Sequence, residues 1–67
     1  MIKHKIGENA GQIWQQLNEK GEMQVKELLK ISAIEETEFN RSLGWLARED
    51  KVGFYSDDEN EIVFLIH

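Results

Sequence analysis

The change of hydrophobic period near residue 50 constrains the fold of this chain more than any other feature. Before it, Phe39, Leu43 and Leu46 repeat at the i, i+4, i+7 spacing of one helical face. After it, two β-rich runs, residues 51–56 (KVGFYS) and 61–67 (EIVFLIH), flank the polar segment DDEN. β-branched and aromatic residues on both sides of a short polar loop are typical of a β-hairpin. The pattern therefore predicts a helix followed by a hairpin.

Helical periodicity also marks the first part of the chain. The apolar residues there fall on one helical face: Ile6, Ala10, Ile13 and Leu17. Asn9 and Gln12 have the spacing of a capping pair, and Gly21 suits the left-handed residue that ends a helix. We therefore expect a first helix over about residues 8–20.

A second, shorter helix is expected between these two regions. Val25, Leu28 and Leu29 have helical spacing, and Met23 before them can form a very short strand. The segment ISAIEE then has to turn, although it contains neither Gly nor Pro. The helices are predicted at about 8–20, 25–31 and 36–49.

These elements predict an α+β fold of the winged helix-turn-helix type in a single domain, residues 1–67. It has three helices, a short strand between the first two, and a C-terminal β-hairpin as the wing. The apolar skeleton of Leu28, Ile34, Phe39, Leu43, Leu46 and Val52 resembles that of the winged helix-turn-helix superfamily. The segments IGENAGQIWQQLNEKGE and LGWLAREDKVGF together are similar to a family of small uncharacterised bacterial winged helix-turn-helix proteins of the Bacteroides type. This resemblance implies a fold and allows a dimer, but it supplies no function, ligand or site.

One position departs from the superfamily pattern. Where a Ser or Thr commonly opens the recognition helix, this chain has Glu35. Glutamate is a weaker N-cap than Ser or Thr, although an acid suits the positive end of the helix dipole.

Composition excludes several classes of protein. The chain has no cysteine, so disulfides and Cys-based metal sites are excluded, as expected in a reducing cytoplasm. No apolar run reaches the roughly 20 residues of a membrane span, and the N-terminal MIKHKIGEN has no apolar core of a secretory signal. We therefore expect a cytoplasmic protein.

Charge is distributed unevenly along the chain. Residues 1–30 carry five lysines and four glutamates, whereas residues 31–67 carry three basic and nine acidic residues, a net charge of −6. The acidic half is the half that contains the third helix and the wing. DNA-binding domains usually present a basic surface to the phosphates.

The outward side of the third helix is nevertheless compatible with DNA. With Phe39, Leu43 and Leu46 turned inward, the side chains predicted to face DNA are Thr37, Asn40, Arg41 and Arg48. Acids lie around them, with Glu35, Glu38 and Glu49 on one flank and Glu36 on the other. The wing tip Asp57-Asp58-Glu59 and Glu61 would repel a phosphate backbone, or else form only a solvated surface.

Several large apolar residues are candidates for a protein interface. Trp14 lies on one helical line with Gly7 and Gly11, which would let another backbone approach, or else the two glycines mark a loose helix start. Trp45 is expected beside the core stripe with Ser42, either covered by the hairpin or exposed as an anchor. The last strand is apolar on both faces, with Ile62, Phe64 and Ile66 alternating with Val63 and Leu65. The predicted interface residues are Trp14, Trp45, Tyr55, Val63 and Leu65, and the predicted partner is a second copy in a homodimer.

The sequence offers no catalytic pattern. His4 and His67 have no ligand spacing, and no serine has a nucleophile-elbow context. The segment SDDENE lacks the glycine and the spaced ligands of a calcium loop. We expect no enzyme activity and no cofactor. Two functions remain: a dimerising protein-interaction module in a regulatory context, which the acids favour, and a DNA-binding transcription regulator, which the fold favours.

Overall fold

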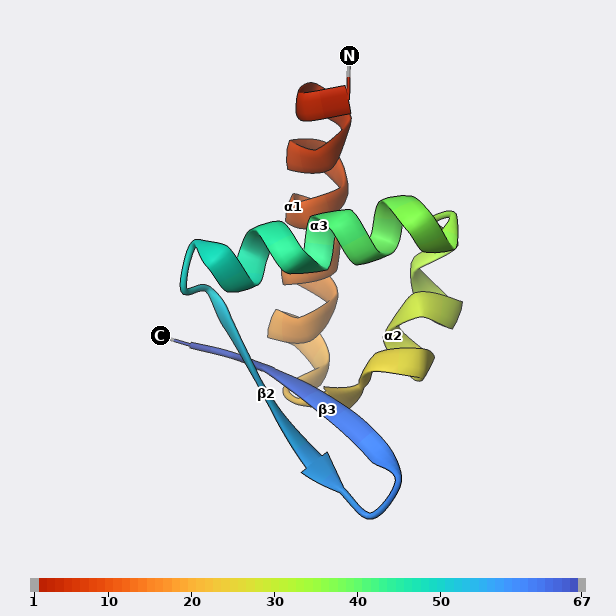
Figure 1. Cartoon of the computed structure of the whole chain (residues 1–67), viewed down its shortest axis with the longest axis vertical. Coiled ribbons are helices and arrows are strands. Elements are labelled where there is room, and N and C mark those ends of the chain that lie inside the picture. Colours follow the sequence, from red (N-terminus) through yellow and green to blue (C-terminus); the bar gives the residue numbers. More distant parts are fainter. Residues whose placement is uncertain (1, 67) are drawn as a thin grey trace.

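The computed structural model describes the backbone of residues 2–66 and the side chains of residues 7–66. Three helices and three strands follow one another in the order expected of a winged helix-turn-helix domain. They are α1 (Ile2–Lys20), β1 (Met23–Gln24), α2 (Val25–Ser32), α3 (Glu36–Arg48), β2 (Val52–Asp57) and β3 (Asn60–Leu65). Figure 1 shows α3 lying across α1, with α2 to one side and the β2–β3 hairpin extending away from α3. The α+β prediction is confirmed.

Helix α1 begins earlier than the sequence predicted. It starts at Ile2, so Asn9 and Gln12 lie inside the helix and cannot form the predicted N-terminal capping pair. Gly7 and Gly11 are also within α1, and therefore do not mark its start. The end of the helix is as predicted, because Gly21 adopts a φ of 84° and its N–H donates to the carbonyl of Leu17 at 2.7 Å.

Helix α2 ends at a turn that contains no glycine. Ala33 takes the left-handed conformation with φ of 58°, which the neighbouring Ser32 supports. The Ser32 hydroxyl donates to the carbonyl of Leu29 at 2.8 Å and accepts from the N–H of Ile34 at 3.1 Å. The Gln12 amide on α1 donates to the Ser32 carbonyl at 2.8 Å. Side chains thus satisfy polar groups at a helix end that the local sequence marks only weakly.

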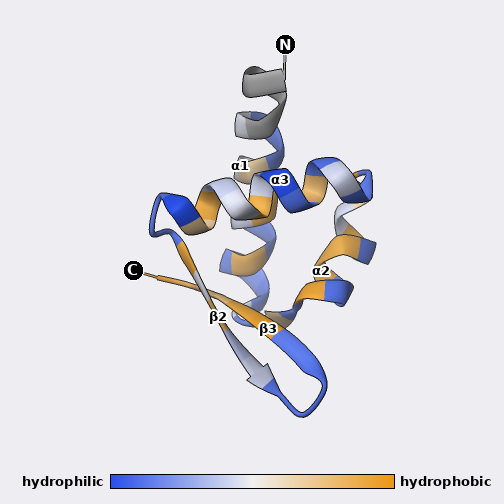
Figure 2. Ribbon diagram, in the orientation of Figure 1, coloured by the Kyte–Doolittle hydropathy of each residue, from blue (hydrophilic) through white to orange (hydrophobic). Residues whose placement is uncertain are grey.

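The sheet is antiparallel with the strand order β1-β3-β2, which places β3 in the centre. Met23 pairs with Val63, and Val52 pairs with Leu65, so the short strand predicted at Met23 is confirmed. The hairpin is tighter than predicted, because Asp57 pairs with Asn60 and only Asp58 and Glu59 remain in the loop. Figure 2 shows a hydrophilic hairpin tip followed by a hydrophobic β3.

The core lies between the three helices and the inner face of this sheet. Its residues are Ala10, Ile13, Leu17, Leu28, Phe39, Leu43, Leu46, Val52 and Val63. Phe39, Leu43 and Leu46 are the stripe that the sequence predicted for α3. Ser42 was expected beside this stripe, but it is completely buried, since its small side chain fits where α3 packs on its neighbours. Its hydroxyl has no hydrogen-bond partner among the described residues.

Gly53 in β2 allows a close approach between the two hairpin strands. It pairs with Phe64, and a Cβ atom at position 53 would lie 2.6 Å from the Cζ of the Phe64 ring. The ring therefore lies over the backbone of β2, where it is half-buried and 6.0 Å from the Tyr55 ring centroid. Any side chain at position 53 would displace it.

Candidate interaction surfaces

Helix α3 presents the predicted DNA-facing residues to solvent. Thr37, Asn40, Arg41 and Arg48 are all exposed. Their positions follow from the burial of Phe39, Leu43 and Leu46 on the opposite side of the helix. These four side chains are therefore free to contact a ligand, and the charges around them limit which ligand that can be.

The start of α3 is capped by an acid. The carboxylate of Glu35 accepts from the backbone N–H of Thr37 at 3.0 Å and from that of Glu38 at 3.2 Å. The pKa of Glu35 is lowered, mainly by the hydrogen bond from the Thr37 N–H. Partial desolvation raises this pKa, whereas the Glu38 N–H and the charge of Arg41 lower it further. Glu35 therefore serves as the N-cap in place of the Ser or Thr of the superfamily.

This cap predicts a pH dependence of stability. Because the folded-state pKa of Glu35 is lower than its unfolded value, its contribution is fully present above the unfolded pKa and is lost as the pH falls through the folded pKa. We expect Glu35→Ala to lower the urea midpoint at neutral pH and to reduce its fall between neutral and acidic pH. Tryptophan fluorescence during urea unfolding measures both, with Glu19→Ala on the exposed side of α1 as the control. An unchanged midpoint at neutral pH would show that the cap is not needed.

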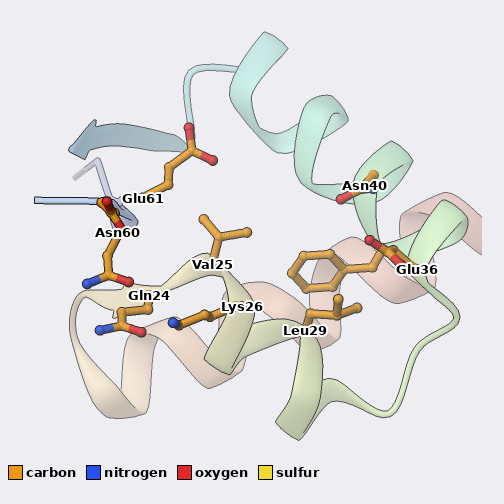
Figure 3. Close-up of a pocket in the computed structure, with 10 residues that line it drawn as sticks. Gln24, Val25, Lys26, Leu29, Glu36, Asn40, Asn60 and Glu61 are labelled. Atoms are coloured by element: carbon orange, nitrogen blue, oxygen red, sulfur yellow. The ribbon is translucent and has the colours of Figure 1, made fainter. Parts of the chain in front are cut away.

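A groove of about 310 Å³ lies between α2, the first turns of α3 and the hairpin, and we call it the α3–wing groove. Its lining residues are Gln24, Val25, Lys26, Leu29, Glu36, Phe39, Asn40, Glu59, Asn60 and Glu61. In Figure 3, Asn60 and Glu61 lie on the hairpin side, Glu36 and Asn40 on the α3 side, and Val25 between them. Three carboxylates and one ammonium group therefore border a groove with an apolar floor.

The hairpin tip adds to this negative charge. The acidic wing, which we define as Asp57, Asp58, Glu59 and Glu61, is exposed throughout. Two of its members, Glu59 and Glu61, line the hairpin side of the groove, across from Glu36 and Asn40 of α3. A phosphate backbone that followed α3 toward the wing would meet carboxylates, and electrostatic attraction supplies most of non-specific DNA affinity.

The two tryptophans are brought together by the packing of α1 against α3. Trp14 and Trp45, with Gly7 and Gly11, line a second, mostly apolar groove of about 270 Å³, which we call the tryptophan groove. Both indole side chains are half-buried, and Trp45 also packs against the core. The sequence left two alternatives for Trp45, a side chain covered by the hairpin or an exposed anchor. In the structure it lies beside α1 and is half-buried, so that part of its indole remains accessible.

Two of the predicted interface residues, Val63 and Leu65, lie on the inner face of the sheet. Val63 is completely buried in the core, and Leu65 is half-buried against it, so neither is an exposed interface residue. Tyr55 pairs with Ile62, and so lies on the opposite face from Val63. The apolar run of β3 has no polar residues that reveal which face is inward, and the hairpin register decides it.

An apolar cluster covers this outer face. Phe64 is half-buried, Ile62 is buried, and Tyr55 and Ile66 are 42% and 47% exposed. The Tyr55 hydroxyl donates a hydrogen bond to the Glu22 carboxylate. This hydrogen bond is the main cause that raises the pKa of Tyr55, and desolvation and the charges of Glu22 and Asp57 raise it further. Of the predicted interface residues, Tyr55 therefore remains accessible on the sheet, and Trp14 and Trp45 remain accessible in their groove.

Comparison with known proteins gives this architecture a family. A family model described as winged helix-turn-helix domain (DUF2582) matches residues 1–65. The chain belongs to this winged helix-turn-helix family. The DUF2582 chain is also 36% identical over 63 residues to the uncharacterised protein MJ1608 of Methanocaldococcus jannaschii, covering 91% of this chain and 90% of that protein.

Solved structures agree with this assignment. The solution NMR structure of protein BT2368 from Bacteroides thetaiotaomicron superimposes with a TM-score of 0.84 at 31% identity, over 97% of this chain and 79% of that chain. A MarR family transcriptional regulator from Silicibacter pomeroyi has a TM-score of 0.73 at 21% identity, over 84% of this chain but only 38% of the regulator. The second likeness concerns the fold of the DUF2582 domain alone. The predicted resemblance to a Bacteroides-type family is confirmed.

The described part of the DUF2582 chain has neither a metal-binding cluster nor a membrane-spanning helix. Among the described residues, no group of three or more His, Asp or Glu side chains is arranged to hold a metal ion. Within the same range, no helix has the length and apolar character needed to cross a membrane.

Sequence reasoning missed the α3–wing groove. The sequence indicates its acids only separately, as a flank of the third helix and as the hairpin tip, and it predicts Val25 and Leu29 only as part of a helical core stripe. Both are half-buried because they lie at the edge of the core, where α2 meets the hairpin. No local signal distinguishes such an edge position from a fully buried one.

Proposed function

We propose that this DUF2582 domain is a non-enzymatic protein-interaction module in a cytoplasmic regulatory system, and that α3 and the wing contact protein in place of DNA. One observation carries the proposal: Glu36, Glu59 and Glu61 border the α3–wing groove, where a DNA-bound winged helix would meet phosphates. Among the residues that the structure describes, Lys26 is the one basic residue that lines this groove. Carboxylates at this position oppose the electrostatic term on which DNA affinity mainly depends.

The competing function is a DNA-binding transcription regulator. It is favoured by the exposed Thr37, Asn40, Arg41 and Arg48 on α3, and by the structural likeness to a MarR family regulator. The likeness shows the fold only, and a fold hosts many functions. The local charge therefore supports the protein-interaction proposal over the DNA-binding one.

Binding to duplex DNA tests this choice. We expect a pool of fluorescent random-sequence duplexes to bind more weakly than the roughly 10⁻⁴ M typical of the weakest non-specific binding, even at about 50 mM salt. Fluorescence anisotropy measures the affinity, and the Arg41→Ala, Arg48→Ala double variant serves as the control. Tight binding that falls steeply with salt and disappears in the double variant would establish the DNA-binding function instead.

We further propose that the domain is a homodimer. The support is the apolar cluster on the outer sheet face, with Tyr55, Phe64 and Ile66 accessible on a domain of 67 residues. Light scattering during size-exclusion chromatography should give twice the chain mass of 7.8 kDa, and Ile66→Lys should give a folded monomer. A wild-type mass of one chain at tens of micromolar would refute the dimer.

A further inference from the structure

The α3–wing groove has a shape that limits what can occupy it. Its volume of about 310 Å³ is at the lower end of the roughly 300–1,000 Å³ of ligand pockets, so it accommodates a few side chains but not a helix of about 10 Å diameter. Val25 and Leu29 are half-buried on its floor, and Phe39, which is completely buried, also lines it. Such a floor favours an occupant with an apolar part.

The rim of the groove limits the charge of the occupant. Glu36 borders it on α3, and Glu59 and Glu61 border it on the hairpin, whereas Lys26 supplies one ammonium group among the described lining residues. Asn40 and Asn60 add amide groups on the two sides of the groove. Asp57 and Asp58 extend the negative charge beyond it along the wing. These charges disfavour an anionic ligand, and a neutral apolar ligand would gain nothing from the carboxylates at the rim.

We propose that the α3–wing groove binds an extended, basic segment of a partner protein, in which a Lys or Arg stands beside an aliphatic or aromatic residue. The apolar residue contacts Val25 and Leu29, and the basic side chain lays its methylene stem on the same floor. Its cationic head then reaches the carboxylates at the rim, Glu36 on the α3 side or Glu61 on the hairpin side, and an Arg can engage one of these carboxylates with two parallel hydrogen bonds. This inference rests on the proposed function, since it names the partner class of the same surface.

Selection from a phage-displayed library of random short peptides tests the proposal with the full chain. The enriched peptides should contain Lys or Arg next to a large apolar residue. In amide NMR spectra, the enriched peptide should shift the signals of Val25, Leu29, Asn40 and Asn60 and leave Gly11 and Trp14 unchanged. Glu36→Gln with Glu61→Gln should weaken its binding about fivefold, as expected for two partly exposed ion pairs. Glu8→Gln with Glu19→Gln, the same charge change on α1, should leave it unchanged.

Three results would overturn the inference while leaving the proposed function intact. The first is that the selection enriches no peptide. The second is that the enriched peptides are acidic or uncharged. The third is that the peptide shifts only amide signals of the tryptophan groove or of the outer sheet face. If the groove signals instead shift with protein concentration alone, a second copy occupies the groove and the inference is also wrong. Failure of the proposed function has a different signature, which is salt-sensitive duplex binding that depends on Arg41 and Arg48.

Discussion

Phe39→Ala is expected to lower the free energy of unfolding by about 3–5 kcal/mol, as for other buried aromatic residues truncated to alanine. Phe39 is completely buried, and its ring lies where α3, α2 and the floor of the α3–wing groove meet. A domain of this size has a total stability on the order of 3–10 kcal/mol, so the variant should be mostly unfolded or close to it. Urea unfolding followed by the fluorescence of Trp14 and Trp45 measures the change.

The matched control is Phe54→Ala, which removes the same ring from a position that is 39% exposed. Phe54→Ala should lower the free energy of unfolding by about 1 kcal/mol or less, as is usual for residues outside the core. If Phe39→Ala gives no measurable folded state, Phe39→Leu provides a smaller truncation with a measurable midpoint. Equal effects of the two alanine variants would contradict the assignment of Phe39 to the core.

The helices and the hairpin could be predicted because their periodicity is strong. Phe39, Leu43 and Leu46 are buried as expected, and the exposure of Arg41 and Arg48 follows from the same helical phase. The start of α1 was missed because Asn9 and Gln12 imitate a cap, whereas interior glycines in a helix cost only about 1 kcal/mol each and can be tolerated.

The faces of β3 could not be predicted from its own residues. Val63 was assigned to an interface and lies in the core, since five consecutive apolar residues give no alternation to read. The two-residue loop at Asp58 and Glu59 sets the register, and the register puts Val63 inward with Val52 and Leu65. The inward face of β3 therefore depends on its pairing with β2 and cannot be predicted from the residues of β3 alone.

The candidate sites could not be predicted from the sequence either, because each of them is formed by tertiary contacts. Sequence reasoning identified Trp14 and Trp45 separately, but only the packing of α1 on α3 places them in one groove. The acids of the α3–wing groove likewise come from two elements, α3 and the hairpin. Their combined effect on a ligand depends on this proximity, since charges more than about 10 Å apart at the surface are largely screened at about 0.1 M salt.

Reversing the charge of the wing is therefore expected to create DNA affinity. Glu59→Lys with Glu61→Lys replaces two carboxylates of the α3–wing groove with ammonium groups, across the groove from Asn40 and Glu36. At about 50 mM salt the affinity for random duplexes should rise at least tenfold, and the slope of log Kobs against log salt should steepen by about 2, because each neutralised phosphate contributes about 0.9.

The control for net charge is Glu8→Lys with Glu19→Lys, which changes the total charge by the same amount on α1. It should leave both the affinity and the salt slope near those of the wild type, because α1 is not part of the α3–wing surface. Equal gains in the two variants would mean that overall charge, and not the position of the wing acids, keeps the domain from DNA. A gain confined to the wing variant would mean that the fold retains the geometry of a DNA-binding winged helix, and that these acids direct its α3–wing surface toward another class of partner.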